Sequence, residues 1–194
     1  DNTPSSVGIT LLDHGNNNTV EADLTVRALM DIPNPVIFDI GANIGTYATW
    51  VAQWARERNG TVYCFEPQRE VFQMLCGNMA INNIFNVHAH QVGLGREEKY
   101  IDLPEVDYCS PESSFAAFSL DGVERNRYKY VANTTQRVKI TTLDKFMREW
   151  NIEKVDFIKI DAEGLDIDVM EGGLETINKF KPDLFVEYLN LGST

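Results

Sequence analysis

Acidic residues follow apolar runs at three places in this sequence, and their positions are the first indication of chemistry. Asp39 lies near the end of the run VIFDI, and Glu66 ends the run TVYCFE. Asp161 and Glu163 follow the run VDFIKI. A carboxylate favours a neighbouring positive charge, and two close carboxylates raise each other's pKa and can act as a base. The pattern predicts a site for a small, positively charged ligand.

A glycine turn, Gly41 to Gly45, follows Asp39 and precedes a helical pattern. Such a turn can place a ligand against backbone N–H groups at the positive end of a helix dipole. The dinucleotide fingerprint G-x-G-x-x-G needs glycines where this chain has Asn43 and Thr46. A pyrophosphate is therefore poorly accommodated. The alternative is that the glycines serve only tight packing of a strand on a helix.

Glu66 narrows the ligand further. An acid at the tip of the second strand of an open α/β sheet accepts hydrogen bonds from ribose hydroxyls. The ligand implied by these positions carries a ribose and positive charge but no pyrophosphate. S-adenosylmethionine fits, because it has a ribose, a sulfonium and an amino group.

Composition limits the classes of partner. The chain has 194 residues, 43% of them hydrophobic, which is enough for one domain with a full core. Its formal net charge is −12. Nucleic-acid binding requires Lys and Arg to neutralise phosphates, and anionic membranes also attract basic segments. We therefore expect a small-molecule or glycan partner, with no nucleic acid and no membrane. The oligomeric state is left open.

The cysteines and the lack of long apolar runs bear on location. Cys64, Cys76 and Cys109 match no zinc spacing, and an odd count makes a poor disulfide framework. Cys64 and Cys76 are predicted to be core thiols in a reducing compartment. No run reaches the roughly 18 apolar residues of a membrane span. No secretory signal is visible in the sequence, which begins at Asp1. These features predict a cytoplasmic protein.

Strand and helix patterns alternate along the chain and must position the acidic residues. Residues 1–19 are expected to be a mobile polar lead-in, and residues 20–194 a single domain. The alternation predicts an α/β fold with a doubly wound, mostly parallel sheet. The strands are expected at residues 36–40, 61–65, 86–92, 155–160 and 184–188, and the helices at 20–30, 46–58, 68–81, 143–150 and 169–179. In the helix at 46–58, Tyr47, Trp50 and Trp54 are expected to pack in the core. Extra short strands are expected at 99–103, 113–120 and 137–141.

Five segments together resemble a known family. They are DIGANIG at 39–45, FEP at 65–67, TLDKF at 142–146, KIDAEGLDIDVMEGG at 159–173 and FVEY at 185–188. Their order and spacing are similar to those of the FkbM-type S-adenosylmethionine-dependent methyltransferases. The resemblance implies the Rossmann-like class I methyltransferase fold. It also implies O-methylation of hydroxyls on sugars or other small molecules.

The resemblance also implies positions for the cofactor. Asp39 and the turn should line its methionine end, Glu66 should hold the ribose, and the residues after the third strand should lie near the adenine. Glu21 lies where such proteins often carry a glutamate before the first strand. The expected cofactor-binding residues are Glu21, Asp39, Gly41, Ala42, Asn43, Gly45, Glu66, Pro67, Val92, Gly93 and Asp161.

The chain departs from the class I pattern at its C-terminal end. The helix and final strand pair that usually follow the fifth strand have no counterpart here, since the sequence stops at Thr194. Either the extra strands within 94–141 complete the sheet, or a further segment or a partner does. Substrate-binding elements often lie in that region, so the acceptor stays open.

A hydroxyl nucleophile must lose its proton to a group within hydrogen-bond reach. We expect Glu163 to accept it and Asp161 to orient cofactor or substrate, although the two roles could be exchanged. Glu187 and His14 are the next candidates, whereas His88 and His90 are expected to be structural. No metal is expected. An alternative is Mg²⁺ held by oxygen ligands from Asp161, Glu187 and Asn190.

Two other classes of function remain possible on the sequence alone. One is a non-catalytic module that binds S-adenosylmethionine without turnover. The other is an NAD- or nucleotide-dependent enzyme on the same sheet, although Asn43 and Thr46 count against it.

Overall fold

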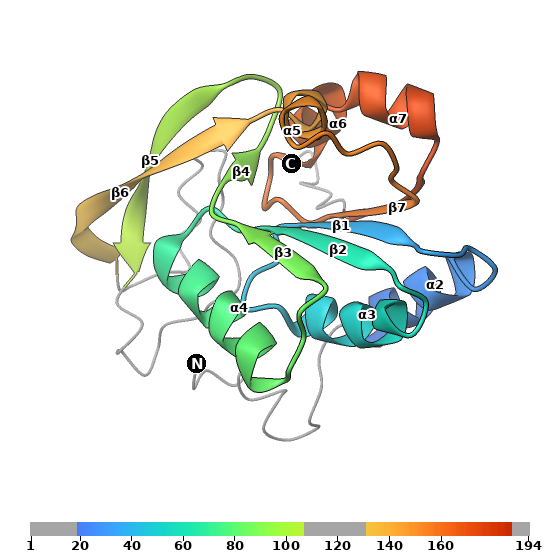
Figure 1. Cartoon of the computed structure of the whole chain (residues 1–194). Helices are drawn as coiled ribbons and strands as arrows, with labels where there is room; N and C mark the ends of the chain where they lie inside the picture. Colours follow the sequence, from blue (N-terminus) through green and yellow to red (C-terminus); the bar gives the residue numbers. More distant parts are fainter. Residues whose placement is uncertain (1–18, 107–130, 188–194) are drawn as a thin grey trace, which may run out of the picture.

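The computed structural model describes residues 19–106 and 131–187. Its centre is a five-stranded parallel sheet in the order β3-β2-β1-β7-β8 (Figure 1). The strands are β1 (Val36–Ile40), β2 (Thr61–Phe65), β3 (Val87–His90), β7 (Phe157–Ile160) and β8 (Asp183–Val186). The expected lead-in, the expected strand at 113–120, and the residues His14, Cys109 and Asn190 lie outside the described residues.

The strand order reverses beside β1, because β2 and β3 lie on one side of it and β7 and β8 on the other. Ile40 pairs with Phe65 on β2 and with Ile160 on β7, so all three strands end at one level. Ligands of open α/β sheets bind outside the carboxyl ends of the strands at such a switch point. The predicted doubly wound, mostly parallel sheet is confirmed.

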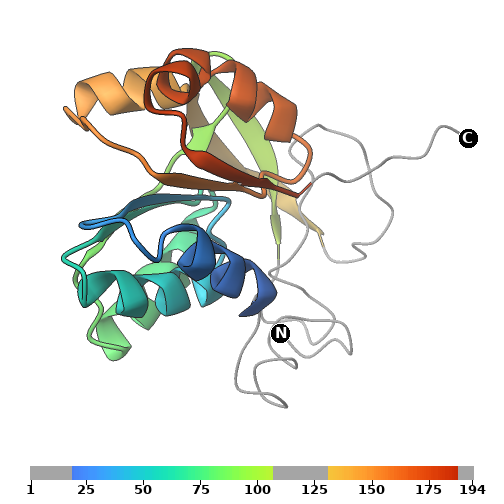
Figure 2. The same cartoon turned by 90° about the vertical axis from the view of Figure 1, so that its right-hand side faces the viewer.

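Helices cover both faces of the sheet (Figures 1 and 2). One layer contains α2 (Thr19–Ala28), α3 (Thr46–Arg56) and α4 (Arg69–Ile81). The other contains α5 (Leu143–Glu149), α6 (Asp166–Glu171) and α7 (Leu174–Phe180). Within the described residues, no helix is both long and apolar enough to cross a membrane.

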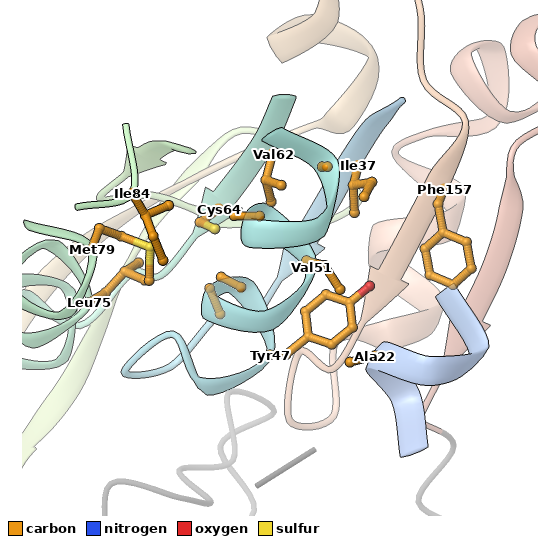
Figure 3. Close-up of a cluster of buried hydrophobic side chains, with 14 of the residues drawn as sticks. Ala22, Ile37, Tyr47, Val51, Val62, Cys64, Leu75, Met79, Ile84 and Phe157 are labelled. Carbon is orange, nitrogen blue, oxygen red and sulfur yellow. The ribbon is translucent and has the colours of Figure 1, made fainter. Parts of the chain in front are cut away.

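The core has two parts because β-strand side chains alternate between faces. On β1, Ile37 packs with the α2–α4 layer, whereas Phe38 packs with Phe65 and Phe146 on the other face. Figure 3 shows the first part, where Tyr47 on α3 lies beside Ala22 on α2. Asp39 shares the face of Ile37, so its carboxylate lies under the helix layer that carries Tyr47.

The inserted strands form a sheet of their own. It has the order β4-β6-β5 and contains β4 (Gly93–Leu94), β5 (Lys99–Val106) and β6 (Val131–Thr141). The possibility that these strands complete the main sheet is therefore wrong, and among the described strands β8 is outermost on its side. Gln136 fastens the small sheet to the start of α4. Its Oε1 accepts from the Arg69 N–H at 2.8 Å, and its Nε2 donates to Glu70 Oε2 at 3.0 Å.

The helix expected at 169–179 is two helices, α6 and α7, which meet at Gly172 and Gly173. Glycine is a poor helix former, and the backbone of Gly95 packs directly on Gly172. A Cβ at Gly172 would lie 2.0 Å from the Gly95 carbonyl oxygen. The break is therefore made by a contact with a segment distant in sequence.

Two side chains expected in the core are exposed. Cys76 lies off the buried face that Val71, Leu75 and Met79 form on α4, so the prediction of a core thiol there is wrong, although Cys64 is buried. Trp50 is 50% exposed on α3, where Tyr47, Val51 and Ala55 form the buried face. Both lie one position away from the stripe that the helical period defines.

Candidate active site

The glycine turn after β1 packs directly against the end of β7. Gly41 has φ +79° and Gly45 has φ +86°, conformations that side chains rarely adopt. A Cβ at Gly41 would lie 1.8 Å from the carbonyl oxygen of Asp161. The glycine is therefore needed for the close approach of two strand ends, in addition to the turn itself.

The backbone N–H groups of this turn are used within the chain. Those of Gly41 and Ala42 both donate to the Phe65 carbonyl at 3.0 Å, and that of Gly45 donates to the Ala42 carbonyl at 2.9 Å. The Asn43 N–H donates to Glu66 Oε2 at 3.1 Å, and the Ile44 N–H donates to Asn43 Oδ1 at 2.7 Å. The N–H groups that were expected from the sequence to contact a ligand are therefore hydrogen-bonded within the chain.

Glu66 connects the turn after β1 with the segment after β2 through hydrogen bonds. It is 4% exposed, and its Oε1 accepts from the Gln68 N–H at 2.9 Å while its Oε2 accepts from Asn43. Burial raises the pKa of Glu66 to about 7, and the two backbone hydrogen bonds limit that rise. A carboxylate has about four acceptor positions, so two bonds leave Glu66 with further acceptor positions, and its contact with a ribose stays a prediction.

Asp39 and Lys159 form a buried ion pair beneath the turn. Asp39 is 0% exposed and Lys159 is 3% exposed. The Lys159 Nζ lies 3.5 Å from Asp39 Oδ1 and 3.1 Å from Asp161 Oδ2, and 5.5 Å from the centre of the Tyr47 ring. Burial opposes the charge on Lys159, but the two carboxylates outweigh it and raise the lysine pKa. The cation beside Asp39 in the structure is thus the chain's own lysine, and a contact of Asp39 with cofactor stays a prediction.

The hydroxyl of Tyr47 connects this pair to α2. Thr25 Oγ1 donates to the Glu21 carbonyl at 2.9 Å and lies 2.7 Å from the Tyr47 hydroxyl. Because the one hydroxyl hydrogen of Thr25 is used on Glu21, Tyr47 is the donor to Thr25. Glu21, expected before the first strand, is therefore linked through Thr25 to the tyrosine that covers Lys159.

Asp161 and Glu187 follow the paired ends of β7 and β8. Ile160 pairs with Val186, and the Glu187 N–H donates to the Ile160 carbonyl at 2.9 Å. The charge of Asp161 is the main cause that raises the pKa of Glu187 to about 7, and burial and a hydrogen bond to Asp161 add to it. The two carboxyl groups therefore form a close pair, which the sequence offered only as a second choice.

A tight turn follows Asp161. Glu163 has φ +47° and Gly164 has φ +100°. The buried Asp166 holds this turn, since its Oδ1 accepts from the Ala162 N–H at 2.7 Å and its Oδ2 accepts from the Gly164 N–H at 3.3 Å. Asp166 therefore caps the turn, which leaves the carboxylate of Asp161 to Lys159 and Glu187.

The residues expected near ribose and adenine lie where the second and third strands end. Pro67 and Gly93 are buried together, because a Cβ at Gly93 would lie 3.6 Å from Pro67 Cβ. Val92 is half-buried beside them in sequence. These residues share the carboxyl edge of the sheet with Glu66, as the sequence implies.

The described histidines belong to an aromatic cluster. The ring of His90 lies 4.8 Å from Phe146 and 4.5 Å from Trp150, measured between centroids, and His88 stacks on Tyr63 at 5.1 Å. Burial, with a smaller contribution from His88, lowers the pKa of His90 to about 4. His90 is therefore neutral near pH 7, and its packing agrees with the expected structural role.

Sequence reasoning missed Lys159 and Asp166. A lysine inside the apolar strand FIKI was a usable signal, because a buried charge requires a charged partner. An Asp close after a glycine turn and at the start of a helix was a capping signal. Among the described residues, no group of three or more His, Cys, Asp or Glu could hold a metal ion. The alternative magnesium set also included Asn190, which is not described.

The acidic groups at this edge suit a cationic ligand better than a phosphate. Asp39 is buried with neither carboxylate oxygen hydrogen-bonded, and Glu66, Asp161 and Glu187 lie at the ends of adjoining strands. Such a set attracts a sulfonium or ammonium group and repels a pyrophosphate. The residues present therefore fit S-adenosylmethionine.

Two proteins of similar sequence are named methyltransferases. "Methyltransferase 1" of Beauveria bassiana is 30% identical over 144 residues, which cover 70% of this chain and 57% of that protein. "2-O-methyltransferase NoeI" of Sinorhizobium fredii is 26% identical over 170 residues, which cover 84% of this chain and 67% of that protein. The chain thus spans between about half and two thirds of the length of these relatives.

A solved structure shares the fold. The crystal structure of methyltransferase FkbM from Methylobacillus flagellatus matches with a TM-score of 0.54 at 16% identity, over 79% of this chain and 32% of that chain. The model of the methyltransferase FkbM domain matches residues 39–192, from the first acidic residue of the site to beyond β8. The chain therefore belongs to the FkbM methyltransferase domain family.

Proposed function

We propose that this chain transfers a methyl group from S-adenosylmethionine to a hydroxyl oxygen of a small molecule or glycan. The observation that carries the proposal is the edge where β1, β2, β7 and β8 end, at which carboxylates and a glycine turn converge in a chain of the methyltransferase family. The name of the 2-O-methyltransferase among its relatives supports oxygen as the acceptor atom.

The cofactor would lie along this edge. The turn from Gly41 to Gly45, with Asp39 and Asp161, would hold the methionine end, and Glu66 with Pro67 would hold the ribose. Val92 and Gly93 would lie near the adenine, and Glu21 would close the site from α2. When bound, S-adenosylmethionine supplies an electrophilic methyl group on a positively charged sulfur.

The reaction is an in-line displacement. The acceptor oxygen forms a bond to the methyl carbon, the carbon–sulfur bond breaks, and its electron pair stays on sulfur. The hydroxyl proton passes to a carboxylate, for which the loop after β7 offers Asp161 and Glu163. Alignment and desolvation of the two reactants provide most of the rate enhancement in such a step.

The acceptor is proposed to be a small molecule or glycan. The net charge of −12 disfavours nucleic acid and anionic membrane surfaces as partners. An uncharged hydroxyl compound meets no such repulsion at an acidic site. A cytoplasmic location would keep the thiols of Cys64 and Cys76 reduced.

Calorimetry with S-adenosylmethionine and with NAD tests the cofactor. We expect binding of the first and none of the second, and Glu66→Ala should weaken binding by about 1–3 kcal/mol because ribose hydroxyls lose their acceptor. Preferential binding of NAD would favour the alternative of an NAD- or nucleotide-dependent enzyme instead.

Turnover is tested by mass spectrometry on a panel of hydroxylated sugars and small molecules. A gain of one methyl mass that requires S-adenosylmethionine supports the proposal. Binding of the cofactor with no methylation across the panel would favour a non-catalytic binding module.

A further inference from the structure

We propose that Asp161 and Glu187 act together as the proton acceptor, and that Lys159 is the positioning residue that holds this pair. The proposal rests on the proposed function for the identity of the reaction. It adds a strand-end glutamate and a buried lysine to the site, and it moves the role of proton acceptor away from Glu163.

Strand pairing brings the two carboxyl groups together. Ile160 pairs with Val186 in register, so Asp161 and Glu187 are the next residues on parallel neighbouring strands. Both backbones are fixed there, since the Asp161 N–H donates to the Ile40 carbonyl at 2.9 Å and the Glu187 N–H donates to the Ile160 carbonyl at 2.9 Å. Two carboxyl groups so placed share one proton more readily than they hold two charges.

Lys159 distinguishes the two carboxyl groups, because it is hydrogen-bonded to Asp161. It lies two residues before Asp161, and its Nζ donates to Asp161 Oδ2 at 3.1 Å. Its side chain is 4% exposed, with Asp39 and the ring of Tyr47 around its head group. The ammonium group is hydrogen-bonded to Asp161, and the pKa that is raised within the pair is that of Glu187. The shared proton therefore resides on Glu187.

The proton balance follows from this arrangement. With both carboxyl groups ionised, the pair takes the hydroxyl proton as the oxygen–methyl bond forms and the carbon–sulfur bond breaks. The proton is then held on Glu187 by a hydrogen bond to Asp161, and it leaves to solvent when the products depart. A base with a pKa near 7 suits this task, and the pKa of Glu187 is raised to about 7 mainly by Asp161.

The charges around Glu187 come from three neighbouring segments. Asp161 and Glu163 raise its pKa, and Lys159 lowers it. Asp39 on β1 acts through Lys159, with which it pairs. Removing the lysine charge should therefore raise the proton affinity of the pair, whereas removing the Asp39 charge alone should not.

The first test is the titration of labelled glutamate carboxyl groups by ¹³C NMR in the protein without ligand. Besides the signal of Glu66, we expect one further glutamate signal with a midpoint near pH 7, which should disappear in Glu187→Gln and persist in Asp183→Asn. Asp183 is an exposed matched control at the opposite end of β8. Persistence of that signal in Glu187→Gln, with Glu187 titrating like an ordinary glutamate, would overturn the proposal.

The second test addresses Lys159. Lys159→Met alone would leave Asp39 buried without a counter-charge, so it is combined with Asp39→Asn to keep the fold. The double variant should move the Glu187 midpoint upward, and Asp39→Asn alone should leave it at or below the parent value. An unmoved midpoint in the folded double variant would remove Lys159 from its role.

The third test uses turnover of the panel compound that gains a methyl group. Glu187→Gln and Asp161→Asn should each lower kcat by roughly 10²–10⁴-fold, and Glu187→Gln should keep cofactor affinity within about twofold. If Glu163→Gln abolishes turnover while Glu187→Gln keeps the parent rate, the proposal is wrong although methyl transfer stands. If the parent protein neither binds S-adenosylmethionine nor methylates the panel, the proposed function fails, and the titration still decides whether the carboxyl pair exists.

Discussion

Gly41 lies directly against the carbonyl oxygen of Asp161, so one glycine fixes the distance between the glycine turn after β1 and the strand end that carries Asp161. A Cβ at this position would lie 1.8 Å from that oxygen, and the glycine φ of +79° is itself unfavourable for other residues. The two parts of the site therefore depend on the same contact.

Gly41→Ala should destabilise the fold by on the order of 3 kcal/mol, because it adds backbone strain to an overlap with a main-chain atom. Gly77→Ala is the matched control, since Gly77 lies within α4 and an added Cβ there meets nothing within 4 Å. That control should stabilise the fold by about 0.5–1 kcal/mol. Denaturant unfolding measures both, and equal effects of the two substitutions would contradict the contact.

Glu66 should make stability fall as the pH rises. Its pKa is about 7 in the folded chain and 4.5 as an ordinary glutamate, so the folded state binds the extra proton between these values. Below pH 4.5 both states are protonated and no penalty exists, whereas above pH 7 the penalty is complete, on the order of 3 kcal/mol. Glu66→Gln should remove this dependence, as measured by denaturant unfolding from pH 4 to 8. An unchanged slope in that window would show that Glu66 titrates normally.

His90 should have the opposite effect. Burial lowers its pKa to about 4, so the folded state resists protonation, while the unfolded state is protonated below the ordinary histidine pKa of 6.5. Its contribution to stability is therefore present above pH 6.5 and lost as the pH falls towards 4. His90→Phe keeps the aromatic packing and should stabilise the fold more at pH 5 than at pH 8. Equal effects at both pH values would point to packing alone.

Asp166 should control the turn that carries Glu163. Asp166→Ala leaves the N–H groups of Ala162 and Gly164 without their acceptor and should cost about 1–3 kcal/mol. Hydrogen exchange of both amides should accelerate, and kcat should fall more than cofactor affinity. Asp183→Ala, at an exposed position of β8, is the control and should leave the exchange of these amides unchanged. Slow exchange retained in Asp166→Ala would mean that another group holds the turn.

The sequence was sufficient to predict the fold and the convergence of the candidate site residues on one edge of the sheet. Apolar runs that end in an acid or a glycine turn marked the ends of β1, β2 and β7, because a strand tip is a local property of the chain. Strand boundaries at Thr61–Phe65 agree with the structure, and the family resemblance is confirmed by the match over residues 39–192.

The structural features that the sequence did not predict depend on contacts between segments that are distant in the chain. The pairing of Lys159 with Asp39 follows from the register of β7 on β1, in which Asp39 lies opposite Lys159. The break between α6 and α7 follows from the packing of Gly95 on Gly172. Both facts require knowledge of which segments are neighbours, and a local pattern does not contain it.

The chain enters and leaves the small sheet at neighbouring positions. Gly93 and Leu94 pair with Ile140 and Thr141, and the Gly95 N–H donates to the Thr141 carbonyl at 2.9 Å. The two ends of the intervening segment are thus joined by hydrogen bonds. Closing a longer loop between fixed ends costs little additional entropy. A change in the length of this segment should therefore leave the register of the parallel sheet unchanged.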